Sequence, residues 1–172
     1  MATVVGGSAV AAYVSDRHAV RAAGERDGVR ESITRVLGAM DIAKGSQTPR
    51  DRFLGILDAG EREIDSAFNG FPAEELSVRQ SVGYGYREIG ETDKAEAQYK
   101  RALELAEQDH ASAAKIGALR LQLAQICAET PAMRFDDAKR YLSDDAVKSV
   151  RESGDRALLS DVLRSRAQIE LM

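Results

Sequence analysis

The sequence contains few of the cysteine and aromatic residues that often stabilise small folds through disulfides or large buried rings. Tryptophan is absent, cysteine occurs once, and aromatic residues make up 5% of the 172 residues. The single cysteine, Cys127, cannot form an internal disulfide, and its place in an apolar helical pattern predicts a small, buried side chain. Because aromatics are scarce while alanine, leucine, glutamate and arginine dominate, the composition predicts helices. The hydrophobic content of 44% suffices for one buried core or one short array of helices.

An excess of positive charge is also missing. The chain has 24 basic and 28 acidic residues, which gives a formal net charge of −4, and no Lys/Arg cluster interrupts the mixture. Proteins that bind nucleic acid usually carry a basic patch that neutralises phosphates. The charge pattern therefore predicts no nucleic-acid partner.

Residues that could form a catalytic, metal or cofactor site do not converge in the sequence. The two histidines, His18 and His110, have no Cys, Asp or Glu at metal-ligand spacing, and His110 is expected at a helix end. The acidic pairs 136–137 and 144–145 lie beside expected helix starts, where capping explains them better than acid/base chemistry. We predict no enzyme activity, no catalytic residue, no metal and no cofactor.

The first residues are uncharged, and the charged residues begin abruptly at Asp16. A stretch of this length cannot cross a bilayer, which requires about 20 apolar residues, and it lacks the positive start of a signal peptide. Residues 1–15 are therefore either a truncated membrane helix or the apolar start of a helix in a soluble protein. The localisation stays open, either cytoplasmic or tethered to the membrane through this segment.

Apolar periodicity predicts about seven helices after this segment. Their expected ranges are 16–40, 49–69, 73–89, 93–110, a fifth that ends before Pro131, 134–153 and 156–171. The sixth could be interrupted at Ser143, because the polar cluster there resembles a fresh cap. We expect the helices of 16–70 to pack on an array of helix pairs in 71–172, with the last helix as its cap.

One repeat carries the most specific pattern. Small and aromatic residues recur between Leu76 and Leu105 at fixed spacing, namely Gly83, Tyr86, Gly90, Ala95, Tyr99 and Ala102. Two helices that cross closely need small residues at the crossing and large ones beside them, and Gly90 fits a left-handed reversal between them. This stretch resembles a tetratricopeptide repeat (TPR), which implies an all-α, TPR-like antiparallel helix-pair array, a short right-handed α-solenoid.

A second, fainter unit follows the first. Ala124 and Cys127 occupy the places of Gly83 and Tyr86, and Ala138 with Leu142 occupies those of Ala95 and Tyr99. The offset of 124 − 83 = 41 residues exceeds the 34 residues of a standard repeat. We therefore expect a fourth helix longer than standard and a longer loop around 129–134.

The order of the upstream elements adds another resemblance. The chain runs from an apolar segment through a charged helix to a helix that starts at a proline and contains FLGILDAGEREI, then through a Phe-Pro loop to the repeat. This order resembles the region that follows the kinase domain in bacterial membrane-anchored serine/threonine protein kinases. This chain contains no kinase motif. The resemblance implies a non-catalytic accessory region of a signalling protein.

The repeat predicts where a protein or peptide partner would bind. In stacked helix pairs the first helix of each pair lines a concave surface, and its exposed residues contact the partner. The predicted contacts are Ser77, Gln80, Tyr84, Arg87 and Glu88, with Tyr84 either a contact or packed on the preceding helix. The alternative is a structural spacer or self-association domain of a membrane-bound protein, which an apolar face at 158–169 would favour.

Overall fold

The computed structural model describes residues 48–172, and in these residues it is helical without a strand. The helices are α2 (Pro49–Ala67), α3 (Pro72–Glu88), α4 (Thr92–Gln108), α5 (Ala113–Glu129), α6 (Phe135–Tyr141), α7 (Asp144–Glu152) and α8 (Arg156–Glu170). The all-α prediction is confirmed. The predicted segment 1–15 and helix 16–40 lie outside the described residues.

Local signals explain where the first two described helices begin and end. The Thr48 hydroxyl accepts a hydrogen bond from the Asp51 amide at 3.1 Å, and Pro49 takes the first helical position, as predicted. After α2 the chain turns at Gly70, whose φ of 85° favours glycine, and Pro72 opens α3. The expected boundaries of both helices are confirmed to within two residues.

The α3–α4 pair crosses closely at Gly83, as predicted. A Cβ atom on Gly83 would lie 3.1 Å from the Tyr99 ring and 3.2 Å from the Gln98 Cβ, so a side chain there would require these neighbours to shift. Ala95 on the facing helix is fully buried. Gly90 adopts a φ of 79°, which lets the Glu91 amide close the turn on the Tyr86 carbonyl at 2.9 Å.

The interruption left open at Ser143 is present, and the added length predicted for the fourth helix is wrong. Residues 134–153 form two helices, α6 and α7, because the Ser143 hydroxyl accepts from the Ala146 amide at 3.4 Å and starts a new helix. The fourth helix is not longer than its neighbours, since α3, α4 and α5 each span 17 residues. Helix α4 stops because His110 turns to a φ of 51° and the Ala111 amide bonds the Ala106 carbonyl at 2.8 Å.

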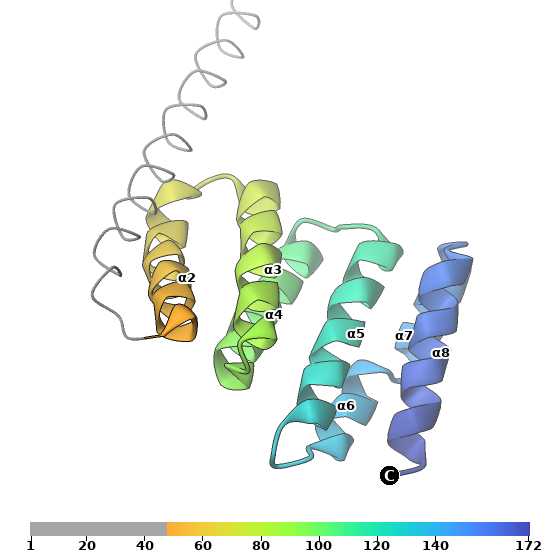
Figure 1. Ribbon diagram of the computed structural model, residues 1–172. Helices are drawn as coiled ribbons and strands as arrows, with labels where there is room; N and C mark the ends of the chain where they lie inside the picture. The colour runs from red at the N-terminus through yellow and green to blue at the C-terminus, as the bar shows by residue number, and fades with distance from the viewer. Residues whose placement is uncertain (1–47) are drawn as a thin grey trace, which may run out of the picture.

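Successive helices lie side by side in chain order, and the pairs form two rows (Figure 1). Helices α3, α5 and α8 lie in the front row of this view, and α4, α6 and α7 lie behind them. Helix α2 packs against α3 at the opposite end from α8. Within residues 48–172, no helix combines the length and the hydropathy needed to cross a membrane.

Two buried clusters lie between the rows. The first core joins α2, α3, α4 and α5 around Leu57, Tyr86, Tyr99 and Leu123. The second core joins α5, α6, α7 and α8, and its buried members are Leu121, Ala124, Cys127, Ala138, Leu142, Val147, Val150, Val162 and Ile169. Helix α5 contributes to both, so it connects the two halves of the described chain. The buried position predicted for Cys127 is confirmed, with no exposed surface.

Candidate binding face

All five predicted contact residues lie on α3. Helical spacing places Gln80 and Arg87 on the side of Gly83, whereas Ser77, Tyr84 and Glu88 lie further round the helix. Ser77, Tyr84 and Glu88 are exposed, whereas Gln80 and Arg87 are partly buried. Tyr84 is 57% exposed and is not a member of either buried core. The Ser77 hydroxyl donates to the Ala73 carbonyl of its own helix at 3.0 Å.

Arg87 connects α3 to α5. Its guanidinium donates to Glu129 at 2.5 and 3.0 Å, to Gln122 at 2.8 Å and to Gln125 at 3.2 Å. Planar guanidinium groups form their strongest bonds with carboxylates in this two-pronged geometry. The donors of Arg87 thus bind acceptors of the same chain, and its predicted contact with a partner stays a prediction.

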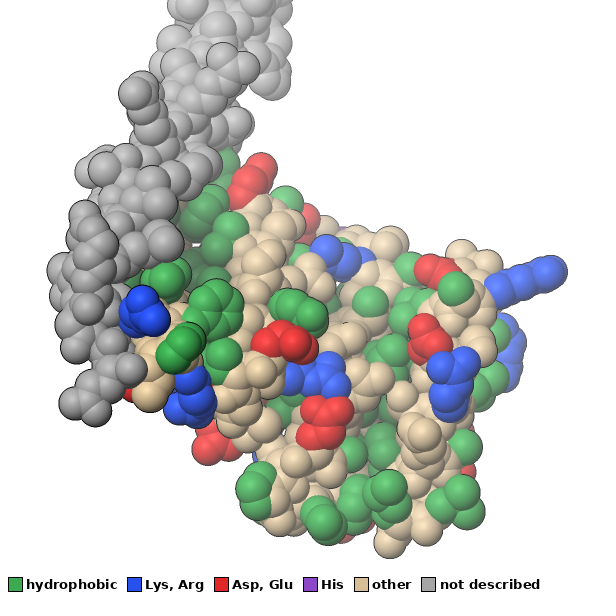
Figure 2. Space-filling model, in the orientation of Figure 1, with side chains coloured by type: hydrophobic (Ala, Val, Ile, Leu, Met, Phe, Trp, Pro, Cys, Tyr) green, Lys and Arg blue, Asp and Glu red, His purple; other side chains and the backbone are tan. Residues whose placement is uncertain are grey.

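A second contact extends this row to α8. The Gln125 side-chain amide donates to the Ser165 hydroxyl at 3.3 Å. Helices α3, α5 and α8 thus present one continuous surface, which we call the front face. Its side chains include Ser77, Gln80, Tyr84, Arg87, Glu88, Gln122, Gln125 and Glu129, and the buried Ser165 of α8 accepts the Gln125 bond. Figure 2, in the orientation of Figure 1, shows acidic and basic side chains next to one another over the middle of this surface and no extended region of either charge.

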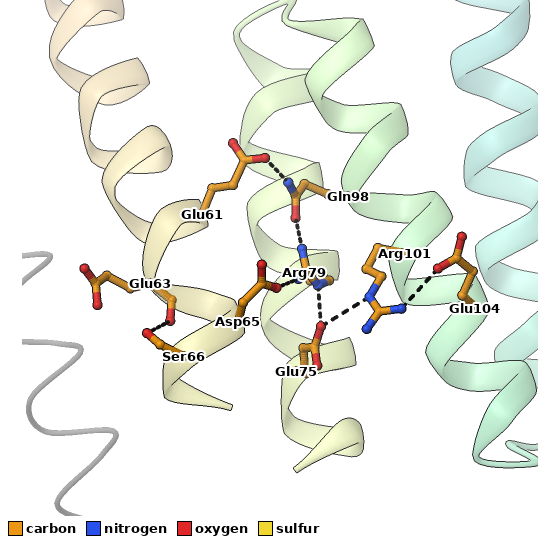
Figure 3. A network of polar contacts seen from close by, with 9 residues as sticks. All are labelled: Glu61, Glu63, Asp65, Ser66, Glu75, Arg79, Gln98, Arg101 and Glu104. Atoms are coloured by element: carbon orange, nitrogen blue, oxygen red, sulfur yellow. Dashed lines mark hydrogen bonds and ion pairs between the residues drawn. The ribbon is translucent and has the colours of Figure 1, made fainter. Parts of the chain in front are cut away.

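A buried arginine organises the interior behind the front face. Arg79 on α3 is 7% exposed, and it donates to Glu75 at 2.8 Å, to Gln98 on α4 at 3.1 Å and to Asp65 on α2. The Gln98 amide in turn donates to Glu61 on α2 at 2.6 Å. Figure 3 shows these side chains meeting between the three helices. Because each buried polar group has a partner, the network fixes how α2 sits on the α3–α4 pair.

Tyr86 completes the contact with α2. Its hydroxyl lies 2.7 Å from Glu61 and 2.8 Å from Asp58, and Lys94 contacts Asp58 at 2.6 Å. Burial and these two carboxylates raise the pKa of Tyr86 far above its ordinary value. Burial raises the pKa of Asp58, but hydrogen bonds from Lys94 and Tyr86 outweigh it and leave the pKa lowered. A phenol has one proton, so Tyr86 donates to one carboxylate at a time.

Another buried carboxylate joins α4 to the loop before α6. Glu96 is 7% exposed and accepts hydrogen bonds from the Arg134 guanidinium, one of them from Nη1 at 3.1 Å. The Lys100 ammonium lies 2.8 Å from the same carboxylate. Burial raises the pKa of Glu96, but the bonds from Arg134 and Lys100 outweigh it and hold the pKa below its ordinary value. Burial likewise raises the pKa of the Cys127 thiol. The Glu96 bonds thus tie α4 to the residue that precedes α6.

The residues that could carry metal or acid/base chemistry lie apart from one another in the described part of the chain. No group of His, Cys, Asp and Glu in the described part of the chain could hold a metal ion. His110 is exposed in the turn after α4, and His18 lies outside the described residues. The pairs 136–137 and 144–145 occupy the first turns of α6 and α7, as predicted. An open depression of about 510 Å³ lies at the start of α6, bordered by Met133, Phe135 and Met172.

Sequence reasoning missed the interior network because its members are polar. Arg79 and Gln98 occupy core positions, since Leu76, Arg79, Gly83 and Tyr86 follow one another at helical spacing on a single face of α3. A charged residue on an otherwise buried stripe predicts an acidic partner on a neighbouring helix. That signal was present, whereas the identity of the partners on α2 and α4 depends on the three-dimensional packing.

No family model, curated protein or solved structure matches this chain. We therefore base the functional proposal on the residues of the front face.

Proposed function

We propose that this chain is a non-catalytic protein-interaction module of the tetratricopeptide type, and that a protein or peptide partner binds its front face. The observation that carries the proposal is the set of hydrogen bonds from Arg87 on α3 to Gln122, Gln125 and Glu129 on α5. They align the first helices of successive pairs into one surface, which is the arrangement through which helix-pair arrays bind extended or helical segments.

The packing of the two helix pairs supports the repeat assignment. In the first pair, Gly83 allows the close approach of Tyr99. In the second pair, Ala124, Cys127 and Ala138 are fully buried and Leu142 is 2% exposed. Helix α8 covers the far end of the second pair and fits the role of a cap. In this proposal the chain is an accessory region of a signalling kinase, as the upstream resemblance implies.

Tyr84 is the side chain of the front face best suited to contact a partner. It is 57% exposed, and the first core does not use it. Tyrosine provides a large apolar area and a hydroxyl group with few rotatable bonds, which is why it is enriched at binding hot spots. The proposal therefore assigns Tyr84 the central contact.

The test is to select binding peptides from a phage-displayed random library on the full chain and to measure the affinity of a selected peptide by fluorescence anisotropy. We expect Tyr84→Ser to weaken binding by about 25-fold or more, because losing a hot-spot aromatic costs at least about 2 kcal/mol. The matched control is Met133→Ser, which removes another exposed apolar side chain, 62% exposed, from outside the front face. Equal effects of the two substitutions would contradict the proposal.

The alternative is self-association through the α8 end. The observation in its favour is Leu163, which is 43% exposed on this last helix. Leu171 and Met172, next to the end of this helix, are 88% and 77% exposed, whereas Val162 and Ile169 are buried in the second core. Light scattering on the full chain tests it: a dimer that Leu163→Ser converts to a monomer would support self-association, and a monomer in both cases would oppose it.

A further inference from the structure

Four exposed side chains follow one another along α3 at helical spacing, namely Ser77, Ser81, Tyr84 and Glu88. The two serine hydroxyls donate to carbonyl groups of their own helix, at 3.0 Å to Ala73 and at 3.1 Å to Ser77. Within residues 48–172, the side chains of Tyr84 and Glu88 have no hydrogen-bond or ion-pair partner. Four positions apart on a helix, their Cβ atoms are about 6 Å from one another. An exposed aromatic ring and an unpaired carboxylate are thus neighbours.

The charges at the end of α3 leave Glu88 unbalanced. Two guanidinium groups lie at this end, and each is already paired: Arg87 with Glu129 and Arg50 with Glu91, both at 2.5 Å. Glu88 is the last residue of α3, where the carbonyl groups of the helix end disfavour a further negative charge. A carboxylate at this position does not favour the helix, and a cation from a partner would remove the conflict.

The same sign of charge prevails over the first half of the described chain. Residues 48–110 contain 14 acidic and 8 basic residues, whereas residues 111–172 contain 9 acidic and 10 basic residues. Such a field attracts a cationic partner towards the α3 half and not towards the α8 half. Because Figure 2 shows no extended acidic region on the front face, the surface fits a single cation better than a long basic segment.

We propose that the front face binds a segment of a partner protein through one arginine side chain, whose guanidinium group stacks on the Tyr84 ring and pairs with the Glu88 carboxylate. The proposal rests on the proposed function and specifies the chemistry of the partner. Arginine fits better than lysine, because its planar group stacks on aromatic rings, forms two parallel bonds with a carboxylate and is more weakly hydrated. Since Tyr84 covers one side of the guanidinium, the affinity does not depend on an exposed ion pair alone.

The substitution Glu88→Gln removes the charge and keeps the shape of the side chain. We expect the variant to bind a library-selected peptide about fivefold more weakly and to unfold at the same or a higher urea concentration than wild type, because a charge unfavourable to the helix end is gone. The matched control is Asp109→Asn, which removes another exposed, unpaired carboxylate from a helix end, that of α4 in the row behind. It changes the net charge equally and should alter affinity less than about twofold.

The experiment is the phage-library selection on the full chain, followed by affinity measurements with a selected peptide and with its copy in which citrulline, an uncharged analogue, replaces arginine. We expect arginine to recur at one position of the selected peptides. Citrulline should weaken binding to wild type and to Asp109→Asn by about fivefold and should have little effect on binding to Glu88→Gln.

Three results would overturn this proposal: selected peptides without a recurrent arginine, an equal effect of citrulline on wild type and Glu88→Gln, or a loss of stability in Glu88→Gln that reveals a partner within the chain. In each case, weaker peptide binding by Tyr84→Ser than by Met133→Ser would leave the proposed function standing. Selection of no binding peptide at all would overturn the proposed function as well.

Discussion

The two helix pairs have a similar arrangement but different interiors. Between α2, α3 and α4 the buried side chains include Arg79, Glu75 and Gln98, and hydrogen bonds join them across three helices. Between α5, α6, α7 and α8 the second core consists of aliphatic residues, alanine and Cys127. The first pair thus relies on polar partners that must all be present, whereas the second relies on the fit of apolar surfaces.

This difference indicates how each half should fail. A buried polar network is sensitive to the loss of one partner and to pH, because a carboxylate that is bonded in the folded state must be protonated in acid. An aliphatic core is sensitive to added or missing volume and indifferent to pH over the same range. The substitutions below test this contrast, from the largest expected effect to the smallest.

Arg79→Ala should have the largest effect. It leaves Glu75, whose side chain is 10% exposed, without its closest cation. It also removes the guanidinium group that donates a hydrogen bond to the side-chain oxygen of Gln98. We expect a loss of about 3–5 kcal/mol in the free energy of unfolding, measured by urea denaturation. The exposed Arg140 is the control, and Arg140→Ala should cost less than about 1 kcal/mol. A loss at Arg79 as small as at Arg140 would show that the network is not essential.

Gly117→Ala should reveal the tight packing of the second core. A Cβ atom at this position would lie 2.3 Å from a methyl group of Val150, so α5 and α7 would have to move apart. We expect a loss of about 1–3 kcal/mol, seen as a lower midpoint in urea. Gly60→Ala on α2 is the matched control, because no atom lies within 4 Å of its Cβ.

At Gly60 the same change should raise stability by about 0.5–1 kcal/mol, since alanine favours a helix interior more than glycine does. Equal and positive effects at the two glycines would contradict the close approach of α5 and α7.

The pH dependence of stability should come mainly from the first pair and from Glu96. The lowered pKa values of Asp58 and Glu96 stabilise the fold above the ordinary carboxyl pKa of about 4, and this contribution is lost as pH falls through the lowered values. The raised pKa of Tyr86 acts at the other end: its contribution is complete below about pH 10 and is lost as pH rises further.

Tyr86→Phe isolates this second contribution. It removes the hydroxyl that bonds Glu61 and Asp58 and should cost about 1–2 kcal/mol at neutral pH. The loss should shrink above about pH 10, where wild-type tyrosine must ionise on unfolding. Urea midpoints of both proteins from pH 7 to pH 11 provide the measurement, and a constant difference across this range would contradict the role of the hydroxyl.

The smallest effect is expected at the outer surface of α8. Arg166 contacts Asp144 at 2.6 Å and Glu170 at 2.7 Å, but both acidic side chains are at least half exposed. Solvent screening limits such pairs, so Arg166→Ala should lower the free energy of unfolding by less than about 1 kcal/mol. A larger loss in urea denaturation would mean that ion pairs also govern the second half.

The sequence allowed the first pair to be predicted in more detail than the second. Gly83 and Tyr99 indicate a close helix crossing by their sizes, and Gly90 indicates a left-handed turn by its backbone freedom. Each of the three occupies its expected place. The break between α6 and α7 was harder to predict, because capping at Ser143 competes with an unbroken apolar period. Periodicity reports which side of a helix is buried, and it carries no information on which helix covers that side.

The same limit applies to the binding face. The exposed side of α3 could be predicted, including Tyr84, because it lies opposite the residues of the crossing. The pairing of Arg87 with Glu129 could not, since the two residues are 42 positions apart and meet only when α3 and α5 are packed. Helix patterns therefore located the face, whereas the pairing of its polar groups across helices required the structure.

The most direct test of a binding role for the front face is an NMR titration of the full chain with a library-selected peptide, following the amide signals of every helix. We predict shift changes concentrated in α3 and α5 around Tyr84 and Gln122, with small changes in α4 and α6 in the row behind. Changes concentrated in α4, α6 or the loop at Met133 would contradict the assignment of the front face as the binding surface.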